Sequence, residues 1–122
     1  MRLIVIIPSF VSSNTFGLDC VDARVAENEM AKKLPQKVDE FTTLVEFSVN
    51  CDTETVKYVK HLSVDASALP TGAAERKQRQ HTNLHCNRQG LASQEGWTVL
   101  DYVYDVNAQL VVALRTTPAM CQ

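Results

Sequence analysis

The chain has 122 residues, of which 45% are hydrophobic and 21% are charged, and its formal net charge at pH 7 is −2. A chain of this length forms one domain, and the composition is that of an ordinary globular protein. Because a surface that follows the phosphates of nucleic acid makes a domain basic, the slightly acidic balance argues against nucleic-acid binding.

The first segment, residues 1–17, has the layout of a short secretory signal. Arg2 precedes the apolar stretch Leu3–Val11, and Thr15 and Gly17 stand at the small-residue positions of a cleavage site. The stretch is too short to cross a bilayer, which needs about 20 apolar residues, and no later segment is long enough. We expect a signal segment at 1–17 and a single domain over 18–122. The alternative is that residues 3–7 form a first strand of the sheet.

A helix is expected from Asp19 or Asp22, either of which can cap its first turn, to Leu34. Pro35 ends it, because the residue before a proline is a poor helical residue. Four apolar residues at three- and four-residue steps define one face of this helix: Ala23, Ala26, Met30 and Leu34.

Two strands are then expected over Thr42–Cys51 and Val56–Val64, because apolar and polar residues alternate there. The turn Asp52–Glu54 joins them into a hairpin, and Asp65–Gly72 is a connector. A second helix is expected over Ala73–Asn87. It is very polar, so its contact with the core should be narrow, and Gly90 stops it or closes a turn.

The last two strands are expected over Trp97–Val106 and Leu110–Thr116, with a turn at Asn107-Ala108. In the first of them Leu100, Tyr102, Tyr104 and Val106 are expected on one face, and Asp101 and Asp105 on the other, toward solvent. The element order α-β-β-α-β-β predicts an α+β fold with a largely antiparallel four-stranded sheet and helices packed on one face.

Four cysteines, at positions 20, 51, 86 and 121, are spaced by about thirty residues. Zinc-binding and redox motifs use pairs of cysteines with two residues between them, and this chain has no such pair. An even number of widely separated cysteines fits long-range disulfides in an oxidising compartment. We therefore expect a periplasmic or secreted, disulfide-stapled protein.

Several features occur together in residues 25–121: Leu34-Pro35, the hairpin, the polar helix with Cys86, Gly96-Trp97-Thr98-Val99, Tyr104-Asp105 and the ending Thr116-Thr117-Pro118-Ala119-Met120-Cys121. In these features the chain resembles the AspS-type pilotins of bacterial type II secretion and a wider set of small exported bacterial domains. The resemblance implies a compact sheet-and-helix fold with a disulfide between Cys86 and Cys121. Pilotins are outer-membrane lipoproteins that bind a short helix at the end of a secretin subunit. A lipid-attachment cysteine follows a small residue, but Asp19 precedes Cys20, which argues against a lipid anchor and leaves Cys20 to pair with Cys51.

The leading functional hypothesis is a non-enzymatic domain that binds a protein or peptide, as an accessory to a bacterial envelope or secretion complex. Its binding surface would include the sheet edge beside the second helix and the basic residues of that helix, which could dock an acidic partner or an anionic glycan or form only a solvated face. These residues are Arg76, Lys77, Arg79 and Arg88.

The alternative hypothesis is a small exported hydrolase or metal-dependent enzyme built on His81 and His85. Two histidines four residues apart share a helix face and can meet one metal ion. A zinc protease would carry Glu after the first histidine, and this chain has Thr82 there. We therefore expect no metal, no cofactor and no catalytic residue, and we expect the histidines to lie on a solvated helix, with one of them shielding the edge of the core.

Overall fold

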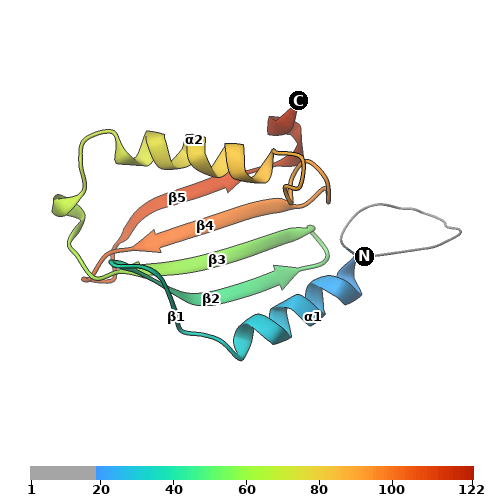
Figure 1. Cartoon of the computed structure of the whole chain (residues 1–122), viewed down its shortest axis with the longest axis horizontal. Helices are drawn as coiled ribbons and strands as arrows, with labels where there is room; N and C mark the ends of the chain where they lie inside the picture. The colour runs from blue at the N-terminus through green and yellow to red at the C-terminus, as the bar shows by residue number, and fades with distance from the viewer. Residues whose placement is uncertain (1–18) are drawn as a thin grey trace, which may run out of the picture.

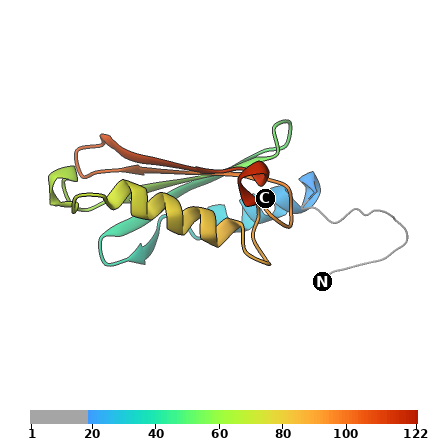
Figure 2. The same cartoon turned by 90° about the horizontal axis from the view of Figure 1, so that it is seen from above.

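The structure, a computed structural model, describes residues 19–122 as a sheet with two helices on one of its faces (Figure 1, Figure 2). The expected signal segment at 1–17 lies outside the described residues. The α+β class is confirmed. Along the chain the elements are α1 (Cys20–Ala31), β1 (Gln36–Asp39), β2 (Thr42–Asn50), β3 (Thr55–Leu62), the 3-10 helix η1 (Ala66–Ala68), α2 (Ala73–His85), β4 (Thr98–Tyr104), β5 (Leu110–Thr116) and the 3-10 helix η2 (Pro118–Cys121).

The sheet differs from the expected four-stranded, largely antiparallel one, because it has five strands in the order β1-β2-β3-β4-β5 and is mixed. The pair β3–β4 is parallel, and the other three pairs are antiparallel. The parallel pair follows from α2, since a chain that crosses one face as a helix can re-enter the sheet in the same direction. Strand β1 escaped prediction because its four residues are all exposed and carry no apolar alternation.

Helix α1 begins at the expected cap, where Asp19 Oδ1 accepts a hydrogen bond from the backbone N–H of Asp22 at 2.8 Å. It ends at Ala31, one turn before the expected Leu34. Of the predicted apolar face only Ala23 is buried. The helix therefore contacts the sheet over a narrow strip beside β2.

The core lies between the sheet and the helices. Strand β2 contains a β-bulge that determines which of its side chains face this core. Leu44 pairs with Lys60 and Glu46 pairs with Val59, so Val45 is an extra residue. A bulge shifts the alternation of faces by one, which explains why Leu44 and Val49 are both buried although they are five residues apart. The buried cluster consists of Ala23, Val49, Val56, Trp97 and Val99.

Strand β4 turns the opposite face to the one expected toward the helices. Val99, Asp101 and Val103 are buried, whereas Leu100 and Tyr102 are half-buried on the open face. Both faces of this strand carry apolar side chains, so alternation alone could not decide between them. The expectation that Asp101 and Asp105 face solvent, opposite an inward set of Leu100, Tyr102, Tyr104 and Val106, is therefore wrong.

Asp105 is buried because it organises the loops at the end of β4. Its Oδ1 accepts hydrogen bonds from the backbone N–H groups of Asn107 (2.9 Å) and Gln109 (3.0 Å), and its Oδ2 accepts one from Ala66 (3.2 Å). A buried carboxylate is tolerated where several N–H groups satisfy it. Asp105 thus ties the β4–β5 turn to η1.

Each of the two disulfides anchors one end of an α-helix. Cys20–Cys51 joins the start of α1 to the end of β2, and Cys86–Cys121 joins the end of α2 to η2. These are the two pairs expected above. Neither of the two α-helices among the described residues has the length and apolar character of a membrane span.

Candidate functional site

Helix α2 packs on β5 through polar side chains and leaves its leucine outside. His81 is only 5% exposed, and its Nδ1 lies 2.7 Å from the hydroxyl of Thr116 on β5. Gln78, one turn earlier, bonds to the backbone of Arg115. Leu84 is 60% exposed. In most helices the apolar residues face the core, whereas in α2 polar residues do so and Leu84 faces outward. Leu84 is therefore available for contact with another molecule.

Leu84 lies at one side of a groove between α2 and the edge of the sheet that carries β1. The groove has a volume of about 200 Å³. Its floor is the inner face of the central strands, and Val38 of β1 forms the other side. Its apolar lining residues are Val38, Leu62, Leu84, Val103 and Leu114, and its polar ones are Asp39, Thr42, Lys60, Lys77, Gln80, His81 and Asp101.

An ion pair lies in the floor of the groove. Lys60 Nζ is 2.8 Å from Asp101 Oδ2, and the aspartate side chain is almost fully buried. Lys60 occupies the inner face because it follows Tyr58 and precedes Leu62 at two-residue steps on β3. Burial raises the pKa of Tyr58, and the charge of Asp101 adds to this shift. The floor of the groove therefore contains a pair of opposite charges beside its apolar side chains.

The two histidines, His81 and His85, lie together in the C-terminal part of α2, with ring centroids 4.6 Å apart. Burial, followed by the neighbouring His85, lowers the pKa of His81 to about 4. Burial also lowers the pKa of His85. Both rings are therefore neutral near pH 7. The structure brings Asp101 near them, but among residues 19–122 no group of three His, Cys, Asp or Glu side chains is placed to hold a metal ion.

The four basic residues expected to form one binding surface lie in different places. Arg76 bends back so that its Nη1 donates to the carbonyl of Thr71 at 3.0 Å. Lys77 lines the groove. Arg79 is exposed on α2, and Arg88 is exposed in the loop after it. Because α2 turns by about 100° per residue, only Lys77 is on the side of Leu84. Of the four basic residues, therefore, only Lys77 lies at the groove.

Lys77 faces an acidic side chain across the groove. The backbone N–H of Phe41 lowers the pKa of Asp39, and Thr42 and the charge of Lys77 contribute further. Phe41 itself is 51% exposed beside β1. The rim of the groove therefore combines exposed apolar side chains with one charge of each sign.

The sheet edge beside α2 is partly closed. Gln78 Nε2 donates to the carbonyl of Arg115 at 2.9 Å, and Gln78 Oε1 accepts from its N–H at 3.1 Å. Both backbone groups that a further strand would use at this position are already bonded. The expected binding surface at this edge is therefore blocked at Arg115.

Sequence reasoning missed two residues that shape the site, Lys60 and Gln78. A signal for Lys60 was present, because it falls in phase with Tyr58 and Leu62 and a lysine in an inward position needs a buried partner. No comparable signal marks Gln78, since a glutamine on a polar helix looks like a solvated residue. Its partner becomes visible only once α2 lies over β5.

No protein-family model and no curated protein sequence matches this chain. Two solved structures share its fold. One is the pilotin EpsS of the Vibrio vulnificus type 2 secretion system, with 15% sequence identity, a TM-score of 0.64 and coverage of 84% of this chain and 90% of that one. The other, from Pseudomonas aeruginosa, is described as a candidate secreted protein, with 13% identity, a TM-score of 0.65 and coverage of 81% and 88%. The resemblance to pilotins is thus confirmed at the level of the fold.

Proposed function

We propose that this chain is a non-enzymatic, extracytoplasmic domain that binds a short segment of a partner protein in the groove between α2 and the sheet. Its role would be that of an accessory to a bacterial envelope or secretion complex. The observation that carries the proposal is the exposure of Leu84 above a floor that contains Leu62 and Val103. An exposed leucine over an apolar floor is the arrangement into which the apolar face of a segment can pack.

The residues at the rim of the groove indicate what kind of partner segment would bind there. An amphipathic helix would place apolar residues against Leu84 and Val38, and an acidic residue beside Lys77. Addition of an extended strand to the β5 edge is disfavoured, because Gln78 occupies the backbone of Arg115. The pilotins that this chain resembles capture a short helix of a secretin subunit, and the proposal extends that mode of binding to this groove.

The cysteines support an extracytoplasmic location. All four are paired, and disulfides persist in oxidising compartments such as the periplasm. The sulfur of Cys20 is bonded to Cys51, so this sulfur is not free to carry the lipid that anchors a pilotin. A signal segment at 1–17 stays a prediction.

The enzyme alternative has less support from the geometry. His81 is buried and its Nδ1 faces the Thr116 hydroxyl, so this nitrogen is not directed at a substrate. Its low pKa makes it a weak base near pH 7. Cys86, the nearest thiol in sequence, is bonded to Cys121 and cannot act as a nucleophile.

The groove can be tested with a pair of exposed leucines. Leu84 is 60% exposed in the groove and Leu110 is 53% exposed outside it, so Leu84→Glu and Leu110→Glu change the surface equally and should both fold. Tagged wild-type and variant proteins would be used to capture partners from envelope extracts of the producing cell, with mass spectrometry. The proposal predicts a partner retained by Leu110→Glu and lost by Leu84→Glu and Lys77→Glu. Capture that is the same for both leucine variants would contradict it.

A further inference from the structure

Two buried polar atoms beside the groove have no hydrogen-bond partner. They are Nε2 of His81 and Oδ1 of Asp101, and among residues 19–122 no other buried side-chain nitrogen or oxygen is left unpaired. The two residues are only 5% and 6% exposed, and both line the groove. Buried polar groups are nearly always hydrogen-bonded, because an unpaired one lowers the stability of the fold. Two such atoms at one groove point to a ligand group that supplies the missing bonds.

The hydrogen bonds behind His81 determine which kind of group is missing. Gln78 Nε2 donates to the hydroxyl of Thr82 at 3.0 Å, so this hydroxyl can direct its own proton to the Thr116 hydroxyl, 3.4 Å away. Thr116 then donates to Nδ1 of His81 at 2.7 Å. In a neutral imidazole the nitrogen that does not accept carries the proton. This network assigns Nε2 of His81 as a donor, whereas Oδ1 of Asp101 is an acceptor.

The charges in the floor of the groove cancel. Lys60 Nζ lies 2.8 Å from Asp101 Oδ2, and His81 and His85 are neutral near pH 7 because burial lowers their pKa values. A charged side chain that entered the floor would bring an uncompensated charge into it. The matching group is therefore neutral, and it both accepts and donates a hydrogen bond. A carboxamide and a hydroxyl have this property.

We propose that the segment bound in the groove carries a glutamine or asparagine whose carboxamide accepts from His81 Nε2 and donates to Asp101 Oδ1, a requirement that rests on the proposed function of the groove. On a helix whose apolar side chains pack on Leu84, a carboxamide reaches farther from the backbone than the hydroxyl of serine or threonine. The two unpaired atoms are shielded from water in the free domain, so a side chain of the floor must move. Lys60, which is long and 27% exposed, is suited to this movement.

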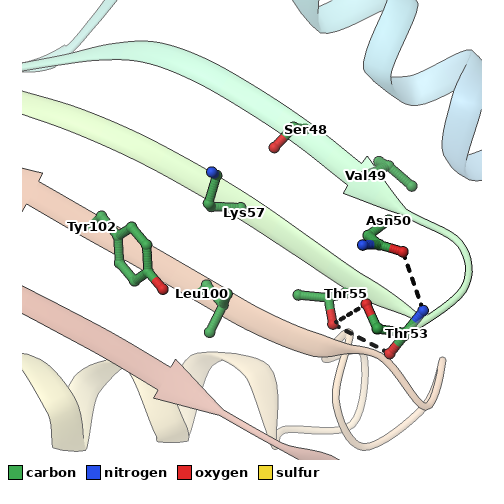
Figure 3. Close-up of a pocket in the computed structure, with 8 residues that line it drawn as sticks. All are labelled: Ser48, Val49, Asn50, Thr53, Thr55, Lys57, Leu100 and Tyr102. Atoms are coloured by element: carbon green, nitrogen blue, oxygen red, sulfur yellow. Dashed lines mark hydrogen bonds between the residues drawn. The ribbon is translucent and has the colours of Figure 1, made fainter.

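The hollow on the other face of the sheet, shown in Figure 3, contains neither of the two unpaired atoms. Asn50 Oδ1 accepts from two backbone N–H groups of the β2–β3 turn. The hydroxyl of Thr53 donates to Thr55 Oγ1, and the hydroxyl of Thr55 donates to the carbonyl of Thr53. Lys57 Nζ is 3.6 Å from Glu46 Oε2. The polar groups of this hollow are thus already bonded to one another, and its ion pair provides a control for the experiment.

The test selects helical peptides, displayed on phage, that bind the disulfide-bonded protein. The library fixes a pair of leucines at i and i+4, which share one helix face and can pack on Leu84. It also fixes one glutamate to face Lys77 and varies the neighbouring positions. Selection on the wild type should enrich glutamine or asparagine at one varied position, the one that faces the floor.

Variants of the floor show whether this preference comes from the unpaired atoms. In Lys60→Met with Asp101→Leu the floor loses the acceptor and both charges, so selection should enrich aliphatic residues at the same peptide position. The matched control is Lys57→Met with Glu46→Leu, which removes an ion pair outside the groove. It should select the same peptides as the wild type.

Synthetic copies of the best wild-type peptide measure the contribution of the carboxamide by calorimetry. Replacing its glutamine by methionine, a side chain of similar length, should weaken binding to the wild type about tenfold or more, because the two buried atoms stay unpaired. Replacing it by glutamate should also weaken binding, since a carboxylate would face Asp101. The change to methionine should have a much smaller effect on binding to Lys60→Met with Asp101→Leu.

Equal affinity of the glutamine and methionine peptides for the wild type would overturn the proposal and would leave the groove as an apolar binding site. Enrichment of serine or threonine at the floor position would also overturn it. Peptides that bind Leu84→Glu as well as the wild type would contradict the groove itself, and this anchor with it. Because the comparison of the two peptides uses the wild-type protein, its result holds even where a variant fails to fold.

Discussion

The side-chain amide of Gln78 makes both hydrogen bonds that a neighbouring strand would make with the backbone of Arg115, at 2.9 and 3.1 Å. The opposite side of the sheet has an equivalent arrangement. Beyond the short strand β1, Arg24 Nη1 donates to the carbonyl of Val49 at 3.0 Å, and Glu27 Oε2 accepts from its N–H at 2.9 Å. Each helix therefore uses polar side chains to satisfy one edge of the sheet. Edges closed in this way resist pairing with other chains.

Replacing Gln78 with Ala should open the β5 edge at Arg115. We expect a loss of stability of about 1–2 kcal/mol, because two hydrogen bonds to the exposed backbone of Arg115 disappear. We also expect self-association at high protein concentration, measured by sedimentation velocity alongside urea unfolding. Gln80→Ala is the matched control, since Gln80 is exposed on the same helix. If Gln78→Ala stays monomeric and as stable as Gln80→Ala, the edge is not protected by this contact.

The disulfides should contribute a large part of the stability. Their cysteines are separated by 31 and 35 residues, and loops of this length correspond to about 3–4 kcal/mol each in the chain-entropy description. Cys20→Ser with Cys51→Ser should loosen α1, whose buried contact with the sheet is Ala23. Hydrogen exchange should then rise in α1 and much less in α2. Equal acceleration in both helices would show that Cys20–Cys51 holds the whole domain and not α1 in particular.

The sequence was sufficient for the elements that have regular apolar spacing or clear stop signals. Strand β5 was predicted with its observed limits, and α2 was predicted to within two residues. At Gly90 a side chain would collide with the backbone of His85, which is why a glycine follows α2. The short strand β1 could not be predicted, because it is held by pairing with β2 and not by an apolar pattern of its own.

The candidate site was harder to predict than the fold, since its residues follow from how α2 lies on β5. Pattern reasoning assumes that helices bury apolar residues, yet α2 buries His81 and exposes Leu84. The corresponding assumption for strands, that charged residues face solvent, placed Asp101 in solvent, whereas Lys60 on β3 neutralises it in the interior. Contacts between two polar residues far apart in sequence leave no periodic signal in either segment.

The pair Lys60–Asp101 predicts a non-additive effect on stability. Lys60→Met should cost about 3 kcal/mol or more, because it leaves the carboxylate of Asp101 buried without its partner. The double variant Lys60→Met with Asp101→Leu should recover much of this loss, since two apolar residues need no partner. Lys57→Met serves as the control, with an expected cost below about 1 kcal/mol for an exposed pair. Urea unfolding of the wild type, the single variants Lys60→Met and Asp101→Leu, and the double variant measures the coupling. Additive costs would contradict the view that the pair acts as a unit in the groove floor.

The buried histidine of α2, His81, predicts a decline in stability in mild acid. The pKa of His81 is about 4 in the folded protein, against an ordinary value of 6.5. Below pH 6.5 the unfolded chain therefore binds a proton that the folded protein does not, and stability falls as the pH drops from 6.5 to about 4. The full shift corresponds to a loss of the order of 3 kcal/mol. The lowered pKa of His85 acts in the same direction.

Urea unfolding between pH 7 and pH 4.5 measures this decline before most carboxylates are protonated. The lowered pKa values of Glu27 and Asp39 place their own losses below pH 4.5, because each stabilises the fold only while it is charged. His81→Gln can keep a hydrogen bond to Thr116 and has no proton to gain, so it should flatten the pH dependence even if it lowers stability at pH 7. His85→Gln should flatten it less, since His85 is half-buried. A His81→Gln variant that keeps the full acid slope would mean that other groups take up the proton, and that burial of His81 does not control stability in this pH range.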